Sequence, residues 1–251
     1  MTRGDGVDDE AVGTTVGVAT ALEELKSDGS ALLVAGAVPG SIYSRLSAGM
    51  LGEGADRRRL LVEQGRSPDA RLAAVDRWTP EWTRVFRCQV ASARSSAGVA
   101  ESQSGSGAGP GSAALPSDGG GYDRAVETVD GSIADLGVAV CGAIGWFDDV
   151  AGGLDPAELR VAFDCVNPLL SAYSPETVFR FLHLFTHQIR AANGMGHVRL
   201  SRPVDSAAVR RLAPLFDAVV ELDLDGSEPI HRWHFRDAAV TSEWLPIDGT
   251  A

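Results

Sequence analysis

The sequence has no long hydrophobic run. Its longest apolar stretch, Leu136 to Phe147, is interrupted by glycines and is shorter than the roughly 20 residues that a bilayer span needs. The first residues, Met1 to Asp5, do not form the charged and then apolar pattern of a signal peptide. We therefore expect no membrane span and a cytoplasmic location.

Lysine is almost absent. Lys26 is the only lysine, so arginine supplies the other basic residues, and 34 Asp and Glu against 22 Lys and Arg give a net charge of −12. A phosphate backbone would meet repulsion over most of such a surface, so we expect no nucleic-acid partner. Carboxylate-rich, lysine-poor surfaces are typical of proteins that stay soluble in molar salt, although a GC-rich genome also favours arginine over lysine.

Cysteine is scarce as well. Cys88, Cys141 and Cys165 are odd in number, widely spaced and each within an apolar segment. This pattern excludes a disulfide framework and predicts reduced thiols in the core. A Cys165 nucleophile would need a histidine and a carboxylate to converge on it in space, which the sequence does not show.

What is present is an alternation of short apolar runs with helical periods, which predicts an α/β domain. We expect three layers, with a mostly parallel sheet, helices on both faces and antiparallel strands at the C-terminal edge around the turn Asp225 to Ser227. The chain length suits one domain over residues 11–247, with a disordered start at 1–10 and a tail at 248–251. A Gly/Ser-rich stretch at about 92–121 predicts a disordered insertion.

The predicted elements of that domain follow in chain order. Helices are expected near residues 12–25, 68–77, 131–147, 175–192 and 206–212, together with one helix after the first strand. Strands are expected at 31–35, 60–63, 84–90, 159–163, 197–200, 218–222 and 230–235.

The turn after the first strand resembles a phosphate-binding loop that has lost its chemistry. Such a loop reads Gly, four residues, Gly, Lys, then Ser or Thr, because its amides and lysine hold phosphates and its hydroxyl holds magnesium. Counted from Gly36, the second glycine falls on Ser41, the lysine on Ile42 and the hydroxyl on Tyr43. Gly36, Gly40 and Ser41 therefore mark a degenerate cofactor position, and we expect no cofactor. The alternative is that this turn still binds ATP with magnesium.

Two carboxylates stand at the ends of other predicted strands. Asp164 follows the apolar run 159–163, where a phosphate-loop ATPase has its magnesium-holding aspartate, and Glu63 has the position of a water-activating glutamate. The alternatives are a turn or helix cap for Asp164 and an exposed strand-end carboxylate for Glu63.

Four segments, taken together in order and spacing, resemble a haloarchaeal family of uncharacterised proteins, sometimes labelled HTR-like, with a degenerate RecA/KaiC-like ATPase domain. The resemblance covers roughly Val12 to Ile247 apart from the insertion, and it implies a RecA-like sheet. In active relatives a hydroxyl follows the strand-end aspartate, where this chain has Cys165. The segments that carry the resemblance are Leu32 to Tyr43, Arg160 to Leu170, Val178 to His183 and Leu215 to Leu222.

Other candidate sites have plain structural readings. His183 and His187 stand four apart on a predicted helix and share a face, which suits either metal chelation or two partly buried, hydrogen-bonded histidines. The run Arg57 to Arg59 is expected to be a solvated strand entry. His231 and His234 lie on opposite faces of a strand, so we expect no shared site.

Two apolar surfaces are candidates for contacts. The helix at 175–192 is apolar over more than half of its circumference, which predicts a helix covered by the sheet and its neighbours, with a partner surface as the alternative. Trp244 to Ile247 form an apolar tail that we expect to dock on its own sheet. For the whole chain we expect a non-catalytic module that acts through protein contacts or self-association, not an enzyme; the alternative is a nucleotide-binding switch or weak ATPase that uses residues 36–41, Asp164 and Glu63.

Overall fold

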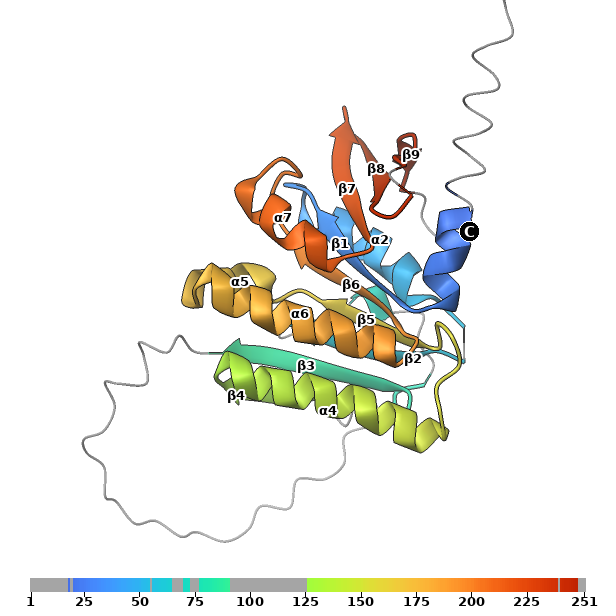
Figure 1. Cartoon of the computed structure of the whole chain (residues 1–251), viewed down its shortest axis with the longest axis vertical. Coiled ribbons are helices and arrows are strands. Elements are labelled where there is room, and N and C mark those ends of the chain that lie inside the picture. Colours follow the sequence, from blue (N-terminus) through green and yellow to red (C-terminus); the bar gives the residue numbers. More distant parts are fainter. Residues whose placement is uncertain are drawn as a thin grey trace, which may run out of the picture.

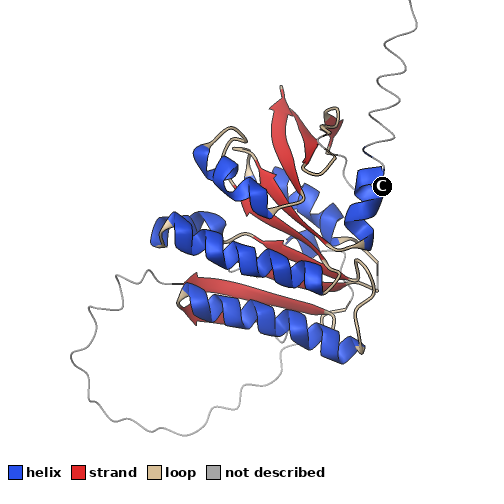
Figure 2. Ribbon diagram, in the orientation of Figure 1, coloured by secondary structure: helices blue, strands red, loops and turns tan. Residues whose placement is uncertain are grey.

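The structure is a computed structural model, and it describes residues 18, 20–54, 56–64, 70–72, 77–90, 126–238 and 240–247. These residues form a nine-stranded sheet with helices on both faces, as Figures 1 and 2 show. The predicted three-layer α/β fold is confirmed. The strands are β1 Ser30–Ala35, β2 Arg58–Glu63, β3 Thr83–Val90, β4 Val126–Gly131, β5 Leu159–Phe163, β6 Met195–Leu200, β7 Ala218–Asp225, β8 Glu228–Phe235 and β9 Leu245–Pro246.

Helices connect most of these strands. Residues 20–27 are helical ahead of β1. The later helices are α2 Gly40–Leu51, α4 Ile133–Ala151, α5 Val166–Ala172, α6 Pro175–Ala191 and α7 Ala207–Leu212, with single 3-10 turns η1 Ala70–Leu72 and η2 Ala213–Leu215.

The sheet order is β4-β3-β2-β5-β6-β1-β7-β8-β9. The strands from β4 to β7 all run parallel, whereas β8 pairs antiparallel with β7 and β9 antiparallel with β8. The predicted antiparallel strands at the C-terminal edge are therefore confirmed, and Gly226 adopts φ +61° in the tight turn that joins β7 to β8.

The central strands are buried because helices cover both faces of the sheet. Every residue of β1 is buried, as expected for a parallel strand covered on both sides. On one face, α4 and α6 pack on alternate residues of the sheet such as Leu33 and Phe163, and this is the largest apolar cluster. On the other face, α2 packs on Leu61 and Val34. Figure 1 shows α4 and α6 side by side in front of the sheet, with α2 behind it.

Neighbouring strands send the chain to opposite faces at two places. After β1 the chain enters α2 on one face, while after β6, its neighbour, it enters α7 on the other. Likewise η1 follows β2 on the α2 face, while α5 follows β5 on the α6 face. In open parallel sheets, crevices form outside the carboxyl ends of the strands at such switch points. Glu63 and Asp164 end the two strands of the second switch point.

The apolar tail docks as expected. β9 pairs with β8, and the buried Ile247 donates its backbone N–H to Pro229 O at 2.9 Å. Arg45 of α2 donates to Ile247 O at 2.7 Å, and the Arg232 guanidinium lies 4.4 Å from the ring centroid of Trp244.

β4, α5 and the short β9 were not predicted as elements. β4 has an exposed edge pattern, which is a weak signal after a Gly/Ser-rich stretch. α5 contains Pro168, which reads as a helix breaker but is tolerated within the first turn. Of the predicted helix 68–77, the structure describes only the 3-10 turn η1 and residue 77; the segments 1–10, 92–121 and 248–251 lie outside the described residues. Among the described residues, no helix has the length and apolarity of a bilayer span.

Candidate functional site

Six polar side chains gather behind the carboxyl ends of β2 and β5, and we call them the Arg71 cluster. The backbone brings them from five places: α2, η1, the ends of β2 and β5, and β6. All are buried except the half-buried Asp164. The members are Tyr43, Ser47, Glu63, Arg71, Asp164 and His197.

Arg71 is the centre of this cluster. Its Nη1 atom lies 2.9 Å from Asp164 Oδ2, and its Nη2 atom lies 3.4 Å from Glu63 Oε2. Nη1 also donates to Ser47 Oγ at 3.3 Å. The Arg71 side chain is only 2% exposed, so these bonds replace its lost hydration. The guanidinium therefore bridges the two strand-end carboxylates that the sequence singled out.

Tyr43 closes the cluster on the side of α2. Its hydroxyl donates to Asp164 Oδ1 at 2.5 Å. Burial and the Asp164 carboxylate raise the pKa of Tyr43 well above its usual value, so the phenol stays protonated and can donate. Tyr43 stands where a phosphate loop has its magnesium-binding hydroxyl, and here that position contacts the strand-end aspartate directly.

His197 extends the cluster along β6. Its Nε2 atom lies 2.6 Å from Ser47 Oγ, and the side chain is buried on the α2 face of the sheet. Burial, together with the positive charges of Arg71 and Arg160, lowers the pKa of His197 to about 3. The imidazole is therefore neutral at physiological pH and fills a polar position in the core.

The turn from Gly36 to Ser41 lies beside this cluster and has its own packing reasons. A Cβ on Gly36 would lie 2.5 Å from Leu222 O, so β7 approaches too closely for any other residue. α2 begins at Gly40, Ser41 is exposed, and Ile42 packs on the apolar cluster beneath α2. The turn thus lacks a lysine, and glycine is required at position 36 by the approach of β7.

One cation does lie near this turn. The half-buried Arg199, next to the last residue of β6, places Nη2 3.7 Å from the position of a Cβ on Gly40. Its guanidinium lies 4.5 Å from the ring centroid of Tyr43. The stacking on Tyr43 holds this charge near the first turn of α2.

A hollow of about 370 Å³ opens outside the carboxyl ends of β1 and β7. Its walls include three carboxylates, from Asp205, Glu221 and Asp223. Glu221 is bonded to Arg232 at 2.7 Å and to His234 at 2.9 Å, whereas Asp205 and Asp223 are exposed. A triphosphate entering this hollow would meet mainly negative charge.

The basic run at β2 was expected to be solvated, and that expectation is wrong. Arg58 and Arg59 are buried. Arg58 donates to Glu158 Oε1 at 2.7 Å, and Arg59 donates to the carbonyl oxygens of Gly52 and Gly54. Burial and the neighbouring Arg57 lower the pKa of Arg59. These arginines tie the start of β2 to adjacent loops and present no binding patch.

The histidine pair was expected to be partly buried and hydrogen-bonded, and this is also wrong. His183 and His187 are both exposed on α6. His197, on the opposite face of the sheet, is not brought near them. In the part of the chain that the structure describes, no group of three His, Cys, Asp or Glu side chains is arranged to hold a metal ion.

None of the three cysteines, Cys88, Cys141 and Cys165, forms a disulfide. Cys88 and Cys165 are buried, as expected, while Cys141 is half-buried. The neighbouring Cys88 and burial raise the pKa of Cys165, so its thiol stays protonated. A nucleophilic role for Cys165 has no support from this environment.

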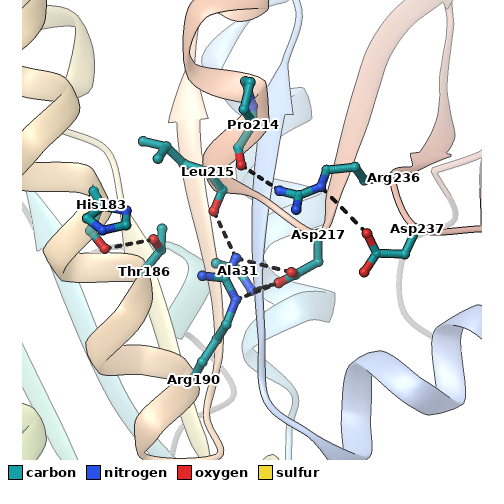
Figure 3. Close-up of polar contacts among 9 residues, drawn as sticks. All are labelled: Ala31, His183, Thr186, Arg190, Pro214, Leu215, Asp217, Arg236 and Asp237. Atoms are coloured by element: carbon teal, nitrogen blue, oxygen red, sulfur yellow. Dashed lines mark hydrogen bonds and ion pairs between the residues drawn. The ribbon is translucent and has the colours of Figure 1, made fainter.

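A second arginine–carboxylate network lies where the parallel strands β1 and β7 begin (Figure 3). We call this end of the strands the amino edge of the sheet, and the opposite end, with the Arg71 cluster, the carboxyl edge. Arg190 of α6 donates to both oxygens of Asp217, at 3.0 and 3.1 Å, and to Leu215 O at 2.8 Å. Asp217 also accepts the backbone N–H of Ala31 at 2.8 Å. This network fastens α6 to β1 and β7, and no local sequence pattern predicts it.

Comparison with known proteins leaves the activity open. The chain matches no curated protein. A family model described as a family of unknown function, DUF7504, matches residues 29–222. That range starts just before β1 and ends within β7, so it includes every residue of the Arg71 cluster. The chain therefore belongs to the DUF7504 family.

Proposed function

We propose that this chain is a non-catalytic relative of RecA/KaiC-like ATPases, a pseudo-ATPase, which serves regulation or assembly through protein contacts in a halophilic archaeon. The observation that carries the proposal is the Arg71 guanidinium, which lies 2.9 Å from Asp164 and 3.4 Å from Glu63. In a working phosphate-loop ATPase, the space beside the corresponding aspartate holds magnesium and its waters. Here the guanidinium of Arg71, a cation of the chain itself, is bonded to the carboxylate of Asp164.

Charge balance supports this reading. The buried Glu63 and the half-buried Asp164 attract a cation, and Arg71 supplies one that is covalently part of the chain. A magnesium ion would have to displace both the guanidinium and the Tyr43 hydroxyl from Asp164. Displacement of Arg71 would break its bonds to four other members of the cluster. Both losses oppose metal binding at Asp164.

The surroundings of the turn support it as well. The position of the phosphate-binding lysine holds Ile42, which packs in an apolar cluster, so the ammonium that would offset phosphoryl charge is missing. The adjacent hollow is lined by carboxylates. The net charge of −12 and the single lysine support the halophilic part of the proposal.

Isothermal titration of the full chain with Mg-ATP in molar KCl tests the proposal. We expect no heat of binding. An affinity tighter than about 100 μM, equivalent to about 5.5 kcal/mol, would overturn it.

A second candidate function is a nucleotide-binding switch or weak ATPase that uses the turn 36–41 with Asp164 and Glu63. The half-buried Arg199 beside Gly40 favours it, because a guanidinium at a helix N-terminus suits an anion. In that case Mg-ATP would bind, and the Arg199→Ala variant would lose that binding. The same titration therefore separates the two functions.

A further inference from the structure

An apolar groove of about 420 Å³ runs between α4 and α6 on the face that Figure 1 turns to the viewer. Val138 of α4 is 76% exposed and Leu184 of α6 is 64% exposed, and they are the two most exposed large hydrophobic side chains of the described residues. Phe181 and Phe185 also line the groove. Because large apolar side chains gather at this exposed groove, it is a candidate contact site.

The groove stays open because α4 presents small residues to it. Gly137 faces the Phe181 ring, since a Cβ there would lie 3.7 Å from Phe181 Cδ2, and Ala134 and Cys141 lie on the same side. The predicted covering of α6 by the sheet and its neighbours is therefore incomplete: its inner face is buried, but Leu184 is left uncovered by the described residues.

The two helices that form the groove differ in charge. α4 contains no basic residue, and its charged side chains, Asp135, Asp148 and Asp149, are all exposed. α6 carries both signs: Glu176 is exposed in its first turn, and the exposed Arg180, one turn later, lines the groove. α4 is therefore acidic, whereas α6 presents a cation, Arg180, to the groove itself.

We propose that a second copy of this chain docks on this groove, with a two-fold axis lying along the groove. A two-fold interface uses the same surface twice, so it must be self-complementary. α4 and α6 both run from the carboxyl edge of the sheet to the amino edge, so this axis sets the acidic α4 of each copy over α6 of the other, which carries Arg180. Another protein would have to supply both signs of charge, whereas this chain already holds them.

The size of the face suits a weak, reversible dimer. α4 has 19 residues, which corresponds to a length of about 28 Å. Two adjacent helices give a face about 20 Å wide, so the two copies together would bury about 1,100 Å², near the lower limit for a specific interface. Because Gly137 lies beside Phe181, the axis brings Val138 of one copy within about one helical turn of Leu184 of the other.

The test is to measure the mass of the full chain by sedimentation equilibrium over a range of protein concentrations. The buffer contains molar KCl, because this salt screens the repulsion between two acidic chains. We expect a monomer–dimer equilibrium that Leu184→Glu weakens by about tenfold or more, since this buries a charge in the groove. The matched control, Leu245→Glu, changes an exposed leucine on β9 and should leave the dimer affinity within about twofold. A wild type that stays monomeric, or a dimer equally insensitive to both changes, would overturn the proposal.

Alkylation of Cys141 reports on the occupant of the groove. Cys141 lines the groove and is half-buried, whereas Cys88 and Cys165 are buried in the core. With a second copy as occupant, Cys141 reacts more slowly as the protein concentration rises. Slow reaction at every concentration, with Leu184→Glu raising the rate but leaving the mass monomeric, would assign the groove to another segment of the same chain and refute the dimer.

This inference names a partner for the assembly role proposed above and rests on it in that respect only. If the chain is monomeric and binds no ATP, the dimer proposal is refuted and the pseudo-ATPase proposal stands. If the chain is dimeric and binds Mg-ATP, the pseudo-ATPase proposal is refuted and the dimer proposal stands.

Discussion

An arginine and an aspartate form an ion pair at each end of the parallel strands, but in different surroundings. At the amino edge, Arg190 and Asp217 are 31% and 24% exposed, and their bonds join α6 to β1 and β7. At the carboxyl edge, Arg71 is 2% exposed and Asp164 15% exposed. Water still solvates the charges of the first pair in part, whereas the second pair has lost most of its hydration and is stabilised mainly by its protein partners. The comparison separates an ion pair that fastens elements at the surface from one that joins two strand-end carboxylates inside the protein.

The largest effect is expected from removing the buried cation. Arg71→Met leaves the buried Glu63 and the half-buried Asp164 without the guanidinium, and breaking a buried ion pair typically costs about 3–5 kcal/mol. Urea unfolding in molar KCl measures the change in free energy. A loss of less than about 1 kcal/mol would mean that water or salt ions already neutralise the two carboxylates, and the contrast between the edges would fail.

The next effect concerns the tyrosine of the same cluster. Tyr43→Phe removes the hydroxyl that donates to Asp164 and leaves the ring in place, so we expect a loss of about 1.5–3 kcal/mol, typical of a hydrogen bond to a charged group. The same unfolding experiment measures it. Tyr173→Phe serves as a control, since its hydroxyl accepts a neutral backbone N–H of Ile133 at 3.1 Å and should matter less.

The pH dependence of stability should report His197. Its pKa is about 3 when folded against an ordinary value of 6.5, so below pH 6.5 the unfolded chain binds a proton that the folded protein does not take up until about pH 3. The contribution of His197 is therefore complete above pH 6.5 and falls as the pH is lowered, by about 2 kcal/mol between pH 7 and pH 5. His197→Gln should lack this part of the decline, while the exposed His183→Gln should keep it. Equal pH profiles for the wild type and His197→Gln would show that the imidazole is solvated.

The smallest effect is expected at the amino edge. Arg190→Met removes the bonds of Arg190 to Asp217. Because both side chains of this ion pair are partly exposed, we expect a loss of about 1 kcal/mol in the free energy of unfolding. Measured beside Arg71→Met, it gives the ratio between the two edges. Equal losses in the two variants would contradict the distinction drawn between them.

The sequence predicted the fold where apolar runs are long and helices have clear starts. β1 has a continuous apolar run over Ala31–Ala35, β5 is apolar except for Arg160, and α6 has Ser174 as its N-cap followed by Pro175, a normal start signal. β4 was missed because an exposed edge strand has no continuous apolar run. The positions of Gly36, Glu63 and Asp164 at strand ends were predicted correctly, and their roles remain predictions.

The partners of these residues were out of reach of local patterns. Arg71 contacts Asp164 across 93 positions of sequence, and no spacing rule links them. His197 offered one unused signal: a histidine inside a strand covered on both faces needs a polar partner in the core, which proves to be Ser47. Sequence reasoning thus identified the carboxylates of the site and missed the cation that holds them.

The central claim is that Arg71 takes the place of magnesium and its waters beside Asp164. A crystal structure grown with a non-hydrolysable ATP analogue and magnesium at millimolar concentration tests it most directly. We predict no metal density at Asp164 and an intact bond between Arg71 Nη1 and Asp164 Oδ2. A magnesium ion bound at Asp164, with Arg71 displaced and phosphates in the turn 36–41, would contradict it.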